Sequence, residues 1–181
     1  MQKKILWITE TAVMLSLLIV LQWVTKPVGQ LLTGSCVNAV LAVTVMFCGL
    51  GSGLTVALLS PVFAYLLGIA PQILTVPAIM LGNAAFVAVL KLVGGGTKIL
   101  WKNIVALLGA SLCKFGLLYV IVRFGICGIL AEGLMAQGLL KAPMLKVLPA
   151  TFGVAQLITA LIGGTVAMLI VPVLKKALKR K

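Results

Sequence analysis

The sequence predicts an all-α integral membrane protein that folds as one transmembrane domain over residues 1–181. Composition gives the first reason, because 62% of the residues are hydrophobic, only 9% are charged and the mean hydropathy is +1.27. A soluble domain averages roughly 45–50% apolar and about 25% charged residues, so this chain cannot cover a surface that faces water. The second reason is pattern: the apolar residues form long runs and do not alternate with polar ones, which favours helices over a barrel.

Six runs approach the roughly 20 apolar residues that a helix needs to cross the hydrocarbon core. They cover residues 5–24, 35–50, 54–69, 74–93, 99–124 and 149–174. The sequence therefore predicts a bundle of six transmembrane helices. Gly49, Gly51 and Gly53 predict the turn after the second helix, and Pro61 predicts a kink or break inside the third. The first run is longer than the apolar core of a signal peptide, so we expect it to be retained.

Residues 125–148 form the one long connection between the predicted helices. Their Leu, Met and Ala residues, interspersed with Glu132, Lys141 and Lys146, fit a short amphipathic helix on the membrane surface. An ordinary mobile loop fits the same residues as well, and the sequence leaves both interpretations open.

Basic residues set the expected orientation, since 15 Lys and Arg stand against 2 Asp and Glu. With six helices both termini lie on one side, which holds ten of the basic residues against four on the other side. The ten are Lys3, Lys4, Lys91, Lys98, Lys102, Lys175, Lys176, Lys179, Arg180 and Lys181. The positive-inside rule then predicts a multi-pass protein of the cell membrane with both termini in the cytoplasm. Basic residues so placed meet anionic lipid headgroups of the bilayer, so no nucleic-acid partner is expected.

The residue inventory argues against an enzyme. The chain has no His, and Glu10 and Glu132 are its only carboxylate side chains. His-based acid–base chemistry, His metal sites and paired-carboxylate sites are therefore excluded. The four Cys form no CxxC pair and no P-loop motif occurs, so we expect no catalytic residue, no metal and no cofactor. A small lipid-modifying membrane enzyme and a structural membrane protein remain the alternatives to a binding role.

Lys114 is the most informative single residue, because it lies near the middle of the predicted helix over residues 99–124. A charge at the bilayer centre costs about 2.5–3.5 kcal/mol on insertion scales. Roughly ten residues, or about 15 Å, separate Lys114 from either helix end, which is too far for an easy reach to the surface. No membrane-embedded carboxylate is placed to pair with it, so we expect an anionic ligand to supply the missing charge. A structural or surface-reaching lysine is the alternative.

Other polar side chains are expected at a similar depth, from the middle of the membrane outward. They are Asn83, Asn38, Gln156, Thr159 and Gln72. Such groups are costly in lipid and should face the bundle interior, where each one alone is more simply explained by a hydrogen bond to a neighbouring helix. Their shared depth with Lys114 favours a substrate site open to the outside, gated by the outer end of the first predicted helix and by the connections at residues 26–34 and 72–75. In it Lys114 is the counter-ion of a carboxylate or similar anion, and Asn83 and Gln156 add hydrogen bonds.

Two parts of the sequence resemble a known family. The residues AVMLS at 12–16, and GLGSGLTVALLSP at 49–61 followed by FAYLLG at 63–68, resemble the S components of energy-coupling factor (ECF) transporters. The small size, the six predicted helices and the basic charge extend the likeness over nearly the whole chain.

The resemblance implies a subunit that captures a vitamin-like solute from outside. It implies two kinds of partner, a T-component transmembrane protein and two ABC-type ATPases, and inward delivery of the solute by toppling of the S component in the membrane. The family's Ala-xxx-Ala motif corresponds to Ala12 and Ser16, with serine in the second place, and these residues would contact the T component. The family's binding site lies near the outer side, walled by helices 4 to 6 and covered by outer loops. The solute itself stays open among small carboxylates.

Overall fold

In the computed structural model, the described residues (2–69, 72–94, 96–97 and 99–178) form helices joined by short connections and contain no strand. The α-helices are α1 (Gln2–Thr25), α2 (Gln30–Phe47), α3 (Leu50–Leu66), α4 (Val76–Leu92), α5 (Leu100–Val120), α6 (Ala131–Ala136), α7 (Met144–Thr151) and α8 (Val154–Ala177). Short 3-10 turns precede α2 and α4, and a π-helical segment follows α5: η1 (Lys26–Val28), η2 (Ile73–Thr75) and η3 (Ile121–Ile129). The all-α prediction is confirmed.

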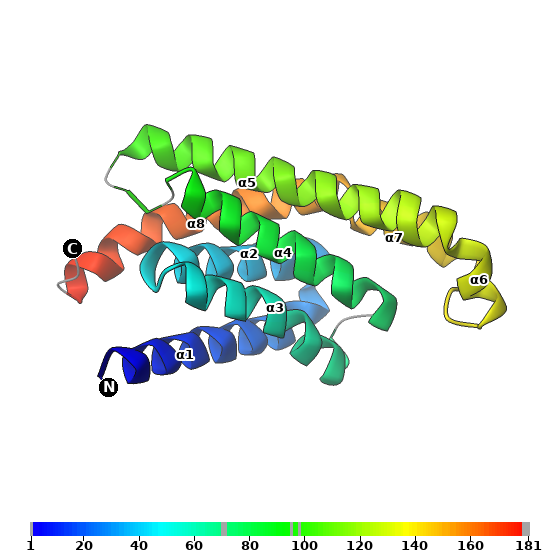
Figure 1. Ribbon diagram of the computed structural model, residues 1–181, viewed down its shortest axis with the longest axis horizontal. Coiled ribbons are helices and arrows are strands. Elements are labelled where there is room, and N and C mark those ends of the chain that lie inside the picture. Colours follow the sequence, from blue (N-terminus) through cyan, green and yellow to red (C-terminus); the bar gives the residue numbers. More distant parts are fainter. Residues whose placement is uncertain (1, 70–71, 95, 98, 179–181) are drawn as a thin grey trace.

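The long helices lie side by side (Figure 1). The start of α1 and the end of α8 lie at one end of the bundle, and α6 lies at the other. The ten basic residues named in the sequence analysis are expected at the first of these ends. Among them Lys98, Lys179, Arg180 and Lys181 lie outside the described residues. The orientation in the membrane stays a prediction.

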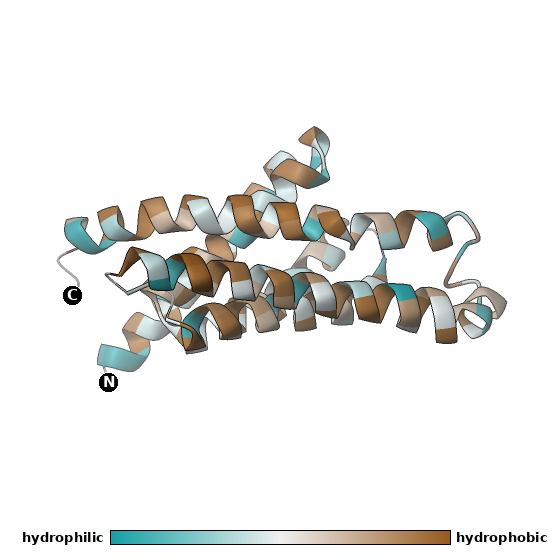
Figure 2. Ribbon diagram, turned by 90° about the horizontal axis from the view of Figure 1, so that it is seen from above, coloured by the Kyte–Doolittle hydropathy of each residue, from teal (hydrophilic) through white to brown (hydrophobic). Residues whose placement is uncertain are grey.

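Five helical stretches are long and apolar enough to cross a membrane. They are Gln2–Val28, Gln30–Phe47, Ile73–Leu92, Leu100–Ile129 and Met144–Ala177. The 17-residue α3 is a shorter apolar helix, about 26 Å long at 1.5 Å per residue, so the sixth predicted span stays a prediction. Hydrophobic residues occur along the whole length of the helices (Figure 2), and large side chains such as Trp101 and Leu169 are exposed. These features fit a multi-pass membrane protein.

α2 is the centre of the bundle, since it packs against α1, α3, α4 and, most extensively, α8. The close approach of α2 and α8 depends on Gly163. A Cβ atom added to this glycine would lie 2.4 Å from the carbonyl oxygen of Ser35 and 2.6 Å from the backbone nitrogen of Ala39. Only a residue without a side chain lets two helix backbones come this close.

The turn between α2 and α3 is shorter than the sequence predicts, and the prediction for two of its glycines is wrong. Only Gly49, with φ of +102°, lies in the turn, whereas Gly51 and Gly53 lie inside α3. Packing explains the difference, because a Cβ on Gly53 would lie 2.8 Å from the side chain of Val87. This glycine lets α3 approach α4. The predicted break at Pro61 is also absent, since α3 continues through it.

Other helix bounds also differ from the prediction, and three of the differences are the largest. α2 begins at Gln30 and not at residue 35, because η1 ends at Val28 and only Gly29, whose φ is +123°, separates the two. The fifth helix was expected to end at residue 124 but continues as η3 to Ile129. The last long helix begins at Val154 and not at residue 149, because Pro149 belongs to α7.

The long connection at residues 125–148 folds against the bundle through a second hydrophobic cluster. Val122 and Ile126, one helical turn apart on η3, belong to this cluster together with Leu148 of α7 and Phe152. The connection contains α6 and most of α7, so the helical interpretation is nearer to the structure than the mobile loop. Its position on the membrane surface stays a prediction.

We expect Gly163→Ala to destabilise the bundle by about 1–3 kcal/mol, because its Cβ has no room unless α8 moves away from α2. Gly116 of α5 is the matched control, since a Cβ there meets nothing within 4 Å. Gly116→Ala should leave the stability unchanged or raise it by about 0.5–1 kcal/mol. Unfolding in mixed micelles, followed by circular dichroism, measures both. Equal stabilities of the two variants would contradict the close approach of α2 and α8.

Candidate functional site

A cavity of about 120 Å³ lies in the half of the bundle away from the start of α1 and the end of α8, and all the long helices contribute to its wall. Its lining residues are Gln22, Gln30, Thr33, Gly34, Val37, Asn38, Pro61, Ala64, Ile69, Ile79, Asn83, Lys114, Thr151, Phe152 and Gln156. Four of the residues that the sequence assigned to a substrate site therefore meet here: Lys114, Asn83, Asn38 and Gln156. Thr159 and Gln72 do not line the cavity.

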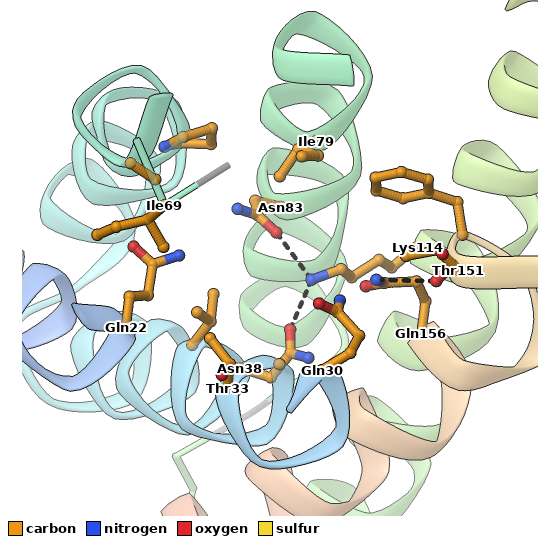
Figure 3. Close-up of a pocket in the computed structure, with 15 residues that line it drawn as sticks. Gln22, Gln30, Thr33, Asn38, Ile69, Ile79, Asn83, Lys114, Thr151 and Gln156 are labelled. Atoms are coloured by element: carbon orange, nitrogen blue, oxygen red, sulfur yellow. Dashed lines mark hydrogen bonds between the residues drawn. The ribbon is translucent and has the colours of Figure 1, made fainter. Parts of the chain in front are cut away.

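Lys114 is 2% exposed and lies on the buried face of α5, one turn after Ser111 and one turn before Leu118. Its Nζ donates hydrogen bonds to Oδ1 of Asn38, at 2.6 Å, and to Oδ1 of Asn83, at 2.7 Å (Figure 3). From the sequence we expected no carboxylate partner for Lys114, and no Asp or Glu is among the described residues that line the cavity. The protein instead offers two neutral acceptors. An ammonium has three N–H donors, so one is left without a partner among the described residues.

Asn83 reaches Lys114 because α4 and α5 pack closely. The neighbouring Gly82 allows this, since a Cβ there would lie 2.7 Å from Cγ of Leu118. The ring of Phe86, one turn further along α4, lies with its centroid 5.6 Å from Nζ of Lys114. An aromatic face at this distance attracts a cation. α4 therefore supplies both an acceptor and a π face to the ammonium.

Asn38 connects Lys114 to α8. Its Nδ2 donates to Oγ1 of Thr159 at 3.2 Å, and Thr159 Oγ1 donates to the carbonyl oxygen of Gln156 at 3.1 Å. Thr159 is fully buried behind Asn38 and outside the cavity lining. The structure thus places Thr159 where it orients Asn38, and not where a solute in the cavity would touch it.

Gln156 and Gln72 have different surroundings. Gln156 lines the cavity and its Nε2 donates to the carbonyl oxygen of Thr151, at 3.4 Å. Gln72 lies outside the lining, and its Nε2 contacts Sδ of Met144 at 2.8 Å. That contact joins the connection before α4 to α7. No residue from 72 to 75 lines the cavity, whereas the lining residues from 26 to 34 belong to α2 and not to a loop.

The sequence placed Asn38 of α2 in the site but did not single out the lining residues that come from α1, α3 and α7. The resemblance pointed to helices 4 to 6, but Gln22 of α1, Gln30 of α2 and Thr151 of α7 also line the cavity. One signal for Gln22 was present in the sequence. Gln22 follows Thr11 by eleven residues and precedes Thr25 by three, so all three share one face of an α-helix.

Among the described residues that line the cavity, Lys114 is the only one with a charged side chain. The other polar groups of this lining are amides and hydroxyls. Amides and hydroxyls both donate and accept hydrogen bonds. The arrangement can therefore bind an anionic group at Lys114 and neutral polar groups around it.

No protein-family model, no curated protein and no solved structure matches the chain significantly, so its resemblance to the ECF S components rests on the residues given above.

Proposed function

We propose that the chain is the solute-binding subunit of a membrane importer and that it captures a small anionic solute in the cavity around Lys114. The observation that carries this proposal is a buried ammonium whose two hydrogen-bond partners are neutral amide oxygens. The two amide oxygens satisfy two of the three N–H donors but leave the positive charge unbalanced, and an unbalanced buried charge is costly. A carboxylate beside Nζ would supply the opposite charge and the third acceptor.

A purely structural lysine explains the arrangement less well. Hydrogen bonding between helices needs no charge, because neutral Asn, Gln, Ser and Thr side chains serve that purpose in membranes. Lys114 also does not extend towards a membrane surface, since its Nζ turns to Asn38 and Asn83 inside the bundle. A negatively charged solute would offset the free-energy cost of burying the ammonium of Lys114, so a binding role explains why the charge is there.

The resemblance to ECF S components supports a particular kind of importer. In this proposal the chain lies in the cell membrane with both termini in the cytoplasm, and its partners are a T component and two ABC-type ATPases. The cavity, in the half of the bundle away from the start of α1 and the end of α8, then faces outward, and its lining includes the exposed Gln30. The chain binds and releases a vitamin-like solute and is not an enzyme. ATP hydrolysis belongs to the partner subunits.

The exposure of α1 supports the proposed contact with a T component. α1 is the least buried of the five candidate membrane spans. Ala12 and Ser16 are exposed and four residues apart on one face, whereas Thr11 and Leu18 are buried. Small residues on an exposed helix face let another helix approach closely.

Lys114→Met should weaken the binding of small carboxylates at least about a hundredfold, because removing one partner of a buried ion pair typically costs about 3–5 kcal/mol. The measurement is calorimetric titration of the purified chain in detergent with a panel of small carboxylates, each beside its neutral primary amide. Wild type should bind the carboxylates and not the amides.

Lys102→Met is the matched control, because Lys102 is exposed near the start of the same helix. It should bind the carboxylates as wild type does. Unchanged affinity in Lys114→Met, or amides that bind as tightly as their acids, would overturn the proposed anionic solute. Thermal melting of each variant without solute checks that the fold is intact.

Ala12→Trp and Ser16→Trp should block assembly with a T component and its ATPases, because the indole fills the space that a second helix needs. Carboxylate binding by the isolated chain should stay unchanged. Cys113→Trp, at an exposed position on α5, is the control of equal bulk and should assemble normally. Co-purification of the tagged chain with a co-expressed T component and its ATPases is the readout. Normal assembly of the double α1 variant would show that the contact lies elsewhere.

A further inference from the structure

The two asparagines that accept hydrogen bonds from Lys114 differ in what their amide nitrogens do. Nδ2 of Asn38 donates to Oγ1 of Thr159 at 3.2 Å, so both ends of this amide are occupied. Asn83 accepts from Lys114 through Oδ1 at 2.7 Å, and its Nδ2 has no hydrogen-bond partner among the described residues. Asn83 therefore has an unused donor, although the residue is only 1% exposed.

The orientation of the Asn83 amide follows from the chemistry of its neighbour. An ammonium donates and never accepts, so the atom that faces Lys114 must be the carbonyl oxygen. Nδ2 is then turned away from Lys114, as Figure 3 shows.

The unused donor of Asn83 is accessible from the cavity. The fully enclosed side-chain N and O atoms without a partner belong, among the described residues, to Gln22, Ser60, Gln72 and Ser111. Nδ2 of Asn83 is not one of these enclosed atoms, and Asn83 lines the cavity. A group bound in the cavity can therefore reach this nitrogen.

A structural role uses only one end of the Asn83 amide. Holding Lys114 requires an acceptor, which a serine or threonine hydroxyl also provides. Asn83 adds an NH₂ group that no described residue satisfies, and removing such a group from water without a partner is unfavourable. The donor becomes favourable when something in the cavity accepts a hydrogen bond from it.

Two donors border the cavity close to one another, namely the third N–H of Lys114 and the NH₂ group of Asn83. They are close because Nζ of Lys114 contacts the oxygen of the same amide. A carboxylate has two oxygens that only accept, so each oxygen can bind one of these donors. A primary amide of the same shape has an NH₂ group in place of one oxygen, and that group would meet a donor of the protein.

We infer, on the basis of the proposed function, that Lys114 and Asn83 together bind the carboxylate of the solute, with one oxygen at each residue. Asn83 is thus a specificity-determining residue, since its NH₂ group recognises the second oxygen. Asn38 has no donor left for the solute and holds Lys114 in place. The solute carries a planar carboxylate whose two oxygens are both free to accept.

The test uses the side-chain amide signals of asparagine, because the chain contains only Asn38, Asn83 and Asn103. The purified full chain, isotopically labelled at asparagine nitrogen alone, is titrated in detergent with acetate, butyrate and hexanoate, each beside its primary amide, and followed by NMR. The acids should move the Asn83 amide protons downfield, as a new hydrogen bond to an anion does, and should move the Asn38 signal less. Asn103 is the internal control outside the cavity lining, since its Nδ2 donates to the carbonyl oxygen of Thr97. Its signal should stay in place, and the primary amides should move none of the three.

Asn83→Leu and Asn38→Leu assign these signals and form a matched pair for calorimetric titration. Each substitution removes one acceptor from Lys114, but only Asn83→Leu also removes a donor to the solute. Asn83→Leu should therefore bind hexanoate about tenfold more weakly than Asn38→Leu does, as expected for one hydrogen bond to the carboxylate. Thermal melting of both variants without solute checks that the fold is intact.

The role of Asn83 would be overturned by an Asn83 signal that moves no more than the Asn38 signal while an acid binds, or by equal affinities of the two leucine variants. Lys114→Met distinguishes this failure from a failure of the proposed function. If Lys114→Met weakens the binding of the acids, anion capture stands whatever the asparagine signals show. Acids that bind equally well without Lys114, or that do not bind at all, overturn anion capture itself.

Discussion

The ammonium group of Lys114 is the constraint on which the cavity half of the bundle depends. A charge at this depth is tolerated only where the surrounding helices exclude lipid and supply acceptors. Asn38 and Asn83 supply them, so the hydrogen bonds join α2, α4 and α5 at a single atom. The bond from Asn38 to Thr159 extends the network to α8. Four helices are thereby held in register around one nitrogen.

This network requires helices to pack more closely than ordinary side chains allow. Gly82 brings α4 against Leu118 of α5, and Gly163 brings α8 against the backbone of α2. Both glycines are adjacent to the network, since Gly82 precedes Asn83 and Gly163 follows Thr159 by one helical turn. Van der Waals packing between small residues is a main source of helix association in membranes. The contacts that hold the bundle together therefore also set the positions of the polar groups in the cavity.

The two sides of the cavity differ in how deeply their helices are buried. Around Phe152, the second hydrophobic cluster holds α7 and η3 together at the end of the bundle. On the other side stands α1, which is the least buried span and reaches the cavity through Gln22. In the proposed function, a solute that contacts Gln22 would touch the same helix that presents Ala12 and Ser16 to a partner. Solute and partner would then act on the same helix.

The sequence by itself determined the all-α membrane character, because composition and run length follow from the cost of placing side chains and backbone in lipid. It also selected a group of six polar residues by depth, since depth along a membrane helix is counted in residues. Four of them, Lys114, Asn83, Asn38 and Gln156, line the cavity, whereas Thr159 and Gln72 do not. Depth does not give the rotation of a helix about its axis or the identity of its neighbours.

Only the tertiary structure decided those relations. It brought Asn38 to Lys114, placed Thr159 behind Asn38 and turned Gln22 into the cavity. Gly53 lies inside α3, where it allows close packing against α4, whereas the sequence predicted a turn at this residue. The physical reason is the same in each case: contacts between residues far apart in the chain, such as Gly163 against Ser35, fix how each helix is rotated, and no local pattern encodes them.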